Sequence, residues 1–340
     1  MSIDSEKDRL SVSIGVFVYN EEKNIARLLC SLLAQKNNAV DIKEIIIISS
    51  GSTDRTDTII SDFLKKHNSI KLIVQEEREG KASAVNLFFE NASEDILVLV
   101  NGDTILGEDS IEKLVLPFHN QCVGMTGGHP VPVNDKNQFL GFTVHLLWNM
   151  HHLISLRNPK LGELIALRNI IRIPRDTAVD EAWMEAIVKS KGFELRYVPD
   201  AVVYNKGPES VSDFLKQRRR IFAGHLDIKK KTGYKLSTVN PLNILFLTLR
   251  GLKLDPRAIL YTSGAILMEL SGRALGFYDY YIRGRNPFIW DVIKTTKELK
   301  NESSACSTFN EGREKRVLRG SSSSRSVLHS SGSGKERSQS

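Results

Sequence analysis

Short apolar runs alternate with amphipathic segments along the first 120 residues of the chain. Four of the runs are rich in Val, Ile and Leu, and each ends in a cluster of turn residues. This pattern is typical of strands that are buried on both faces of a parallel sheet. The predicted strands cover Val12–Tyr19, Ile42–Ile48, Ile70–Val74 and Ile96–Val100.

The segments between these strands place apolar residues on one face of a helix. The predicted helices are marked by Ile25, Leu28, Leu29, Leu32 and Leu33, by Ile59, Ile60, Phe63 and Leu64, by the segment Gly80 to Asn91, and by Ile111, Leu114, Val115 and Phe118. Strands and helices that alternate at this spacing predict an α/β fold, a three-layer α/β/α sandwich with a mostly parallel central sheet and right-handed crossovers.

The pattern becomes less regular after Gly124, and no element is assigned between there and Trp148. Between Pro241 and Ile282 the apolar stretches are interrupted by charged residues, which is typical of amphipathic helices. Such helices either lie on a membrane surface or pack on the domain, and the pattern alone does not separate the two. No long uninterrupted apolar run and no signal peptide are present, so we expect neither a spanning helix nor a leader.

The chain is thereby predicted to have three parts. Residues 1–235 form the α/β domain, residues 236–300 form a C-terminal helical region, and residues 301–340 form a basic, Ser-rich tail that cannot bury a core and is expected to be disordered.

The net charge of +7 is unevenly distributed, because residues 216–235 hold eight Lys or Arg against one acid. This basic run predicts a local basic surface for phosphates, anionic lipid or nucleic acid. The three cysteines are odd in number and lie far apart without metal-ligand spacing, which favours a reducing, cytoplasmic setting.

Polar clusters follow each of the four predicted strands. Neither a G-x-G-x-x-G nor a G-x-x-x-x-G-K-[ST] motif is present, which argues against a dinucleotide-binding or P-loop enzyme. Because the carboxyl ends of parallel strands meet at one edge of a sheet, the clusters converge there. Together they supply an aromatic ring, carboxylates, a Ser/Gly turn and a Lys, a combination that suits a nucleoside diphosphate with Mg²⁺ or Mn²⁺.

In this set of motifs the sequence resembles the family 2 glycosyltransferases of the GT-A fold, over roughly residues 10–235. The matching segments, in chain order, are Tyr19–Glu22, Ser49–Asp54, Arg78–Lys81, Asn101–Asp103, the pair Asp180-Glu181 and Gln217–Ile221.

The resemblance implies an inverting enzyme that moves a sugar from a nucleotide-diphosphate sugar to a hydroxyl or phosphate acceptor. It implies donor contacts from Tyr19, Glu21, Ser50, Lys81, Asn101, Asp103 and Arg220, acceptor contacts from Gln217 and Glu163, and Mn²⁺ or Mg²⁺ held by Asp103. The catalytic base is Glu181 or Asp180. Since adjacent helical side chains point about 100° apart, only one of them faces the acceptor, and we choose Glu181.

Three departures from the family pattern refine this picture. Ser49 and Ser50 stand where the family often has Asp contacts to the nucleotide base, so the base stays open. Asn101 replaces the first acid of the metal motif, so that Asp103 carries most of the metal charge. Ile221 replaces the Trp found in polymer-making members, which favours transfer of a single sugar over synthesis of a long polysaccharide.

The expected partners are the sugar nucleotide, a lipid-linked or glycan acceptor, and the anionic inner face of the cell membrane. One alternative is a degenerate fold that binds sugar nucleotides without turnover, suggested by Ser50 and Asn101. Another is a nucleic-acid-binding protein, but the basic run lacks interleaved aromatic residues, so no nucleic acid is expected. His145, His151 and His152 are interpreted as packing residues, and the segment Trp290–Lys297 is faintly similar to the gating segment of membrane-bound relatives.

Overall fold

A computed structural model of the chain describes residues 9–234, 255–285, 289–290 and 293–297. Its strands are β1 (Leu10–Val18), β2 (Val40–Ser50), β3 (Ile70–Gln75), β4 (Ile96–Asn101), β5 (Ile105–Leu106), β6 (Val123–Pro132), β7 (Leu164–Arg168) and β8 (Glu194–Asn205). Its α-helices are α1 (Ile25–Leu33), α2 (Thr56–Leu64), α3 (Lys81–Asn91), α4 (Ser110–Val115), α5 (Phe139–Ser155), α6 (Asp180–Ser190), α7 (Val211–Thr232) and α9 (Pro256–Phe277). Short 3₁₀ segments cover Leu116–His119 and Lys294–Thr296, and a π-helical turn covers Tyr278–Ile282.

The strands form one sheet in the order β3-β2-β1-β4-β7-β6-β8-β5. Strands β3, β2, β1 and β4 are parallel, while β7 is antiparallel to both of its neighbours and β5 is antiparallel to β8. The predicted α/β fold with a mostly parallel central sheet is confirmed. The parallel half consists of the four strands that the apolar runs predict.

Both faces of the sheet are covered. Along β2 the four Ile residues from Ile45 to Ile48 are all buried, although successive side chains of a strand point to opposite faces. On one face, Ile46 and Ile48 belong to a core cluster to which α3 contributes Phe88 and α6 contributes Met184. The continuous apolar runs therefore reflect burial between two layers, as the sequence pattern predicts.

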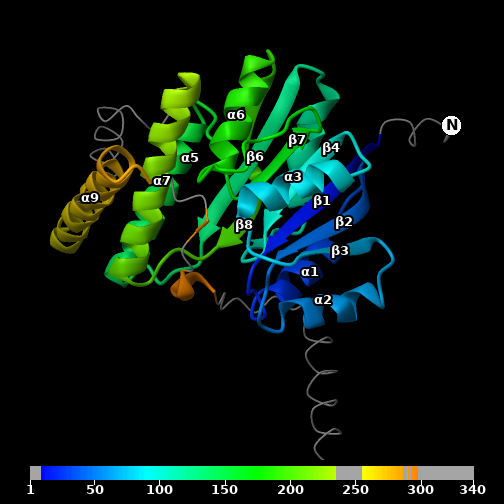
Figure 1. The fold of residues 1–340 in the computed structure, drawn as a ribbon, viewed down its shortest axis with the longest axis horizontal. Coiled ribbons are helices and arrows are strands. Elements are labelled where there is room, and N and C mark those ends of the chain that lie inside the picture. Colours follow the sequence, from blue (N-terminus) through cyan, green and yellow to red (C-terminus); the bar gives the residue numbers. More distant parts are fainter. Residues whose placement is uncertain (1–8, 235–254, 286–288, 291–292, 298–340) are drawn as a thin grey trace, which may run out of the picture. The chain divides into compact units, whose positions relative to one another are not determined.

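The carboxyl ends of β1, β2 and β4 meet at one edge of the sheet (Figure 1). There the backbone of Gly102 donates to the carbonyl of Phe17 at 3.0 Å. A Cβ at Gly102 would lie 2.7 Å from Val18 Cγ1, so only glycine permits this close approach between the two strand ends. The antiparallel strand β7 starts at the same edge, which brings the loop before it to the strand ends.

Helices α5, α7 and α9 pack beside the sheet (Figure 1), with α9 in contact with both of the others. Ser210 caps the start of α7 by accepting from the backbone of Asp213, and Gly233 ends it in the left-handed conformation. None of the helices that the structure describes combines the length and the apolarity needed to cross a bilayer. The apolar stretch Ile244–Leu247 and the Ser-rich tail lie outside the described residues.

The basic residues of α7 fall into two groups: Lys216, Lys229, Lys230 and Lys231 are exposed, whereas Arg218 and Arg219 pair with acids of the C-terminal helical segment. Arg218 forms two hydrogen bonds to Glu269 of α9, at 2.6 and 2.8 Å, and Arg219 pairs with Asp279. Their acidic partners lie more than 50 residues further along the chain, where a local charge count does not include them. These two arginines therefore join α7 to the C-terminal helical segment.

The three histidines of α5 make packing and polar contacts. His145 Nε2 lies 2.9 Å from the carbonyl of Asn134, and His152 Nδ1 lies 2.8 Å from the hydroxyl of Tyr197. His151 is buried, and burial lowers its pKa to about 3, so that it is neutral at physiological pH.

Candidate active site

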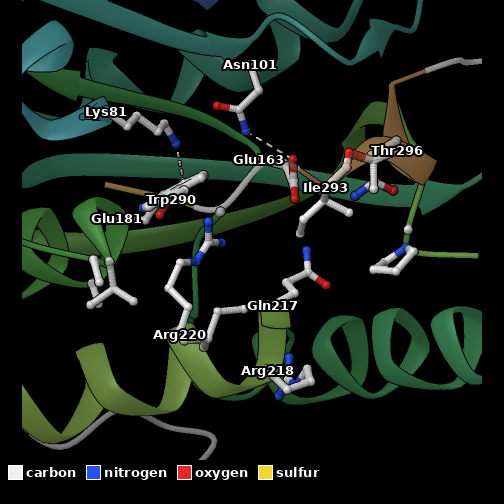
Figure 2. Close-up of a pocket in the computed structure, with 18 of the residues that line it drawn as sticks. Lys81, Asn101, Glu163, Glu181, Gln217, Arg218, Arg220, Trp290, Ile293 and Thr296 are labelled. Atoms are coloured by element: carbon white, nitrogen blue, oxygen red, sulfur yellow. Dashed lines mark hydrogen bonds and ion pairs between the residues drawn. The ribbon is translucent and has the colours of Figure 1, made fainter. Parts of the chain in front are cut away.

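A cavity of about 610 Å³ opens at the carboxyl edge of the sheet. All but one of the predicted site residues line it, namely Tyr19, Glu21, Ser50, Lys81, Asn101, Asp103, Glu163, Glu181, Gln217 and Arg220. The exception is Asp180, which lies behind the cavity wall with its side chain only 2% exposed. Figure 2 shows side chains from the sheet, from the start of α6 and from α7 pointing into the same space. The predicted convergence of these residues on one cavity is therefore observed.

The sheet side of the cavity carries an excess of negative charge. Burial and, to a smaller extent, the charge of Asp103 raise the pKa of Glu163 to about 7. Glu163 has a left-handed backbone (φ 61°), and its carboxylate accepts a hydrogen bond from the Asn101 amide at 3.1 Å (Figure 2). Burial, and then Asp103, likewise raise the pKa of Glu21 to about 7. Carboxylates that repel one another at the end of a strand provide a favourable place for a cation.

Asp103 and its neighbours supply some, but not all, of the ligands that a hard divalent cation needs. Carboxylate oxygens are the ligands that Mg²⁺ and Mn²⁺ prefer. Within the described residues, however, no three acidic, His or Cys side chains gather closely enough to hold a metal by themselves. A cation bound here would therefore take its remaining ligands from a diphosphate and water, which is how Mg²⁺ is commonly held in phosphate-transfer sites.

Lys81 connects the sheet to helix α6. It is the first residue of α3, after Gly80, whose φ of 93° permits the sharp entry into the helix. Its ammonium lies 2.8 Å from Glu181 (Figure 2) and 2.9 Å from Asp180, and these two acids are the first two residues of α6. Burial opposes the charge of all three groups, but Lys81 holds the pKa of Glu181 below its usual range. Burial and the neighbouring Glu181 raise the pKa of Asp180 to about 7.

Tyr19 and Ser50 line the cavity at the strand ends. The guanidinium of Arg78 stacks on the Tyr19 ring, 4.0 Å from its centroid. Ser50 is buried, and its hydroxyl has no hydrogen-bond partner in the described part of the chain. A buried hydroxyl without a hydrogen-bond partner lowers the stability of the fold, unless a bound ligand supplies that partner.

Residues of the C-terminal segment, including Trp290, line the cavity. In the sequence, the only indication of this was the faint similarity of Trp290–Lys297 to the gating segment of membrane-bound relatives. The Trp290 ring lies beneath the guanidinium of Arg220, with 3.5 Å between Arg220 Cζ and the ring centroid (Figure 2). Lys297 pairs with Glu21 and donates to the carbonyl of Tyr19 at 2.8 Å. An indole therefore lines the cavity from position 290, although position 221 holds Ile. Sequence reasoning also gave no role to Arg78, because its contacts are long-range.

Glu185, one helical turn after Glu181, provides a test of the buried charges. Its carboxylate accepts from the backbone of Leu161 at 2.7 Å and from the hydroxyl of Tyr234 at 3.1 Å, and burial raises its pKa to about 7. A carboxyl whose pKa is raised on folding binds its proton more tightly in the native state, so stability falls as the pH rises from about 4.5 to about 7. We expect Glu185→Gln to stabilise the fold at pH 8 by roughly 1–2 kcal/mol and to change little at pH 4.5.

Urea unfolding at both pH values measures this effect, with the exposed Glu194→Gln as the matched control. A variant that is equally destabilised at pH 4.5 and pH 8 would contradict the buried-proton account.

Comparison with known proteins places this geometry in context. Residues 13–168 match the family described as glycosyl transferase family 2. Among curated proteins, the poly-beta-1,6-N-acetyl-D-glucosamine synthase of Staphylococcus aureus is 28% identical over 216 residues, covering 59% of this chain and 51% of that protein. The synthase of the same name from Staphylococcus epidermidis is 26% identical over 223 residues, covering 62% of this chain and 53% of that protein. The chain thus spans about half the length of the curated relatives it matches.

The fold is also found in a solved structure. A mannosyltransferase from Pyrobaculum calidifontis, in complex with GDP-Man and Mn²⁺, superposes with a TM-score of 0.57 at 20% identity, over 82% of this chain and 87% of that one. The likeness extends beyond the segment that the family match covers and includes elements after residue 168.

Proposed function

We propose that this chain, which carries a family 2 glycosyltransferase domain of the GT-A fold, transfers a sugar from a nucleotide-diphosphate sugar to an acceptor. One observation carries the proposal: a single cavity joins the carboxylate-rich ends of the parallel strands to the ion pair between Lys81, at the start of α3, and Glu181, at the start of α6. The relatives named above are polymer synthases of N-acetylglucosamine, so a nucleotide-activated N-acetylglucosamine is the first donor to test.

In this proposal the donor lies along the sheet edge. Tyr19 and Ser50 contact the nucleoside, and Asp103 is the residue that would hold a divalent cation. Such a cation neutralises the charge that develops on the leaving diphosphate. Lys81 faces the same region and adds a second positive charge there, while Arg220 contributes the guanidinium that suits phosphate oxygens.

In this proposal the reaction is a direct displacement with inversion at the anomeric carbon. Glu181 accepts the proton of the acceptor hydroxyl, whose oxygen forms a bond to the anomeric carbon. The bond between that carbon and the diphosphate oxygen breaks, and the nucleoside diphosphate leaves with the electron pair. Gln217 and Glu163 line the cavity near these groups and are assigned to the acceptor. Glu181 is assigned the proton because its side chain is 24% exposed, whereas Asp180 is buried behind it.

Donor binding and transfer are tested together. The purified chain is heated with UDP-, GDP- or dTDP-linked sugars, with and without Mn²⁺, and released nucleoside diphosphate is measured in parallel. A stabilising ligand raises the unfolding temperature in proportion to its occupancy. We expect one sugar nucleotide to raise it only when the cation is present. Binding without release, given a suitable acceptor, would favour the degenerate fold instead.

We further propose that α9 rests on an anionic membrane surface. Its exposed apolar side chains recur at helical spacing and include Leu260, Leu267 and Leu270, of which Leu260 is 68% exposed. Exposed Arg257 and Arg283 lie at the two ends of this stripe and complement an anionic headgroup layer. An apolar stripe flanked by cations is typical of a helix that lies in the membrane interface.

Replacing all three leucines by Ser is expected to weaken binding to vesicles at least about tenfold, since each buried leucine contributes free energy in proportion to its apolar area. Co-sedimentation with phosphatidylglycerol-containing and purely phosphatidylcholine vesicles measures it, with Val74→Ser as a control at another exposed apolar site, on β3. Equal binding of the triple variant and the unaltered chain would refute the membrane assignment.

A further inference from the structure

The cavity extends from the strand ends into a second group of charged side chains between α5, α7 and α9. We call this group the inner lobe. It is lined by Lys160, Glu185, Arg218, His225, Glu269 and Arg273. Apart from Arg218, which lies within the Gln217–Ile221 segment, none of these residues belongs to the motifs from which the site was predicted. They come from the loop after α5 and from α6, α7 and α9, so only the folded chain brings them together.

Positive charge exceeds negative charge in the inner lobe. Glu269 accepts two hydrogen bonds from Arg218 and one, at 2.8 Å, from Arg273, so a single carboxylate serves two guanidinium groups. Glu185 is directed to the Leu161 backbone and the Tyr234 hydroxyl. These pairings leave one cationic group more than the acids can neutralise.

That group is the ammonium of Lys160. It makes no hydrogen bond or ion pair with any residue in the described ranges, and it lies among Arg218, Arg273, Glu185 and Glu269. Burial and, to a smaller extent, the charge of Arg218 lower the pKa of Lys160 to about 8, so the amine still carries its charge for most of the time at neutral pH. Lys160 is half-buried on the wall of the cavity, and an ammonium there without a direct partner is available to an anion supplied by a ligand.

The walls beside this cation are apolar. Trp148 and Ile154 of α5, together with Phe222 and Leu226 of α7, line the same cavity. An ammonium and a guanidinium at the end of an apolar-walled space match a phosphate group attached to a larger molecule. The lobe opens into the same cavity as Glu181, so such a molecule can reach the proposed base.

We propose that the inner lobe binds a phosphate group carried by the acceptor, with Lys160 as its principal contact. This inference rests on the proposed function, because it assigns a chemical class to the acceptor of the same cavity. It places the acceptor's anion apart from the donor's diphosphate, which lies at the strand ends.

The test measures binding of hexyl phosphate, glycerol 3-phosphate and the neutral match hexanol to the full chain by calorimetry. We expect at least one of the phosphates to bind and hexanol to bind far more weakly. Lys160→Met and, as a second variant, Lys160→Gln are expected to weaken phosphate binding at least tenfold. Lys191→Met, an exposed lysine outside the cavity, is the matched control and is expected to bind like the unaltered chain. Preference for hexyl phosphate identifies a lipid acceptor, and preference for glycerol 3-phosphate identifies a polyol phosphate.

Binding of the sugar nucleotide to the same variants separates the phosphate-site inference from the proposed transferase function. If Lys160→Met keeps its affinity for the sugar nucleotide while losing phosphate binding, the inner lobe is a site of its own. If the sugar nucleotide does not bind but Lys160-dependent phosphate binding is observed, the proposed function is refuted and the phosphate site is retained. Phosphate affinity that is unchanged in both Lys160 variants, or equal affinity for hexanol, overturns the inference.

Discussion

Replacement of Asp103 by Asn is expected to reduce turnover about 10²- to 10³-fold, the cost of losing one preorganised group that stabilises transition-state charge. Asp103 follows β4 directly, and its charge already raises the pKa values of Glu21 and Glu163. Because Asn101 has no charge, Asp103 is the acid of the Asn-Gly-Asp motif that can hold a cation. Asn is nearly isosteric, so the loss is expected without a change in fold.

The measurement is the rate of nucleoside diphosphate release across a Mn²⁺ titration. The unaltered chain is expected to show saturable dependence on the cation, and the variant is expected to lose both the rate and the dependence. Asp62→Asn, which removes an exposed ion pair with Lys65 on α2, serves as the matched control. An Asp103→Asn variant with full rate and unchanged cation dependence would refute the assignment of the metal to this residue.

The parallel half of the fold could be predicted because its signal is local. The runs that form the inner strands β1, β2 and β4 are mostly apolar and buried, which favours a central parallel sheet, and β3 pairs with β2 as its edge strand. The other half could not be predicted in the same way. In β6 the segment contains Gly127, Gly128 and Pro130, and its partners β7 and β8 lie 30 or more residues further along the chain. Long-range pairing of this kind leaves no periodic pattern in a short window.

The same distinction between local and long-range signals applies to the cavity. Residues at strand ends, such as Ser50 and Asp103, could be placed because the sheet topology alone brings strand ends together. The Trp290 ring stacks on Arg220, and Lys160 approaches Glu269, only after α9 and the C-terminal segment have packed. No motif spacing encodes these contacts. The cavity's polar edge was therefore predictable, while its inner lobe and its C-terminal wall required the structure.

Glu181→Gln is expected to lower kcat about 10²- to 10⁴-fold, the usual contribution of a positioned general base, with the donor KM changed only a few-fold. Two residues are candidates for the general base, and each meets one of the two requirements, a suitable pKa or access to the acceptor. Asp180 has the pKa nearer neutrality, which suits a base, but its side chain is 2% exposed and faces Lys81. Glu181 reaches the cavity, but Lys81 holds its pKa low. Geometry decides, since a base must reach the proton that it accepts. A donor diphosphate that draws Lys81 away from Glu181 would also restore its basicity.

Asp180→Asn therefore has a different expected signature. It removes a partner of Lys81, so the donor KM is expected to rise while kcat falls less than in Glu181→Gln. Steady-state kinetics of the two variants distinguish the roles, and Glu194→Gln, on an exposed position of β8, controls for the loss of a surface carboxylate. A kcat that collapses in Asp180→Asn but persists in Glu181→Gln would transfer the role of base to Asp180. That result would require the start of α6 to rotate, because the adjacent side chains point about 100° apart and only one of them faces the acceptor at a time.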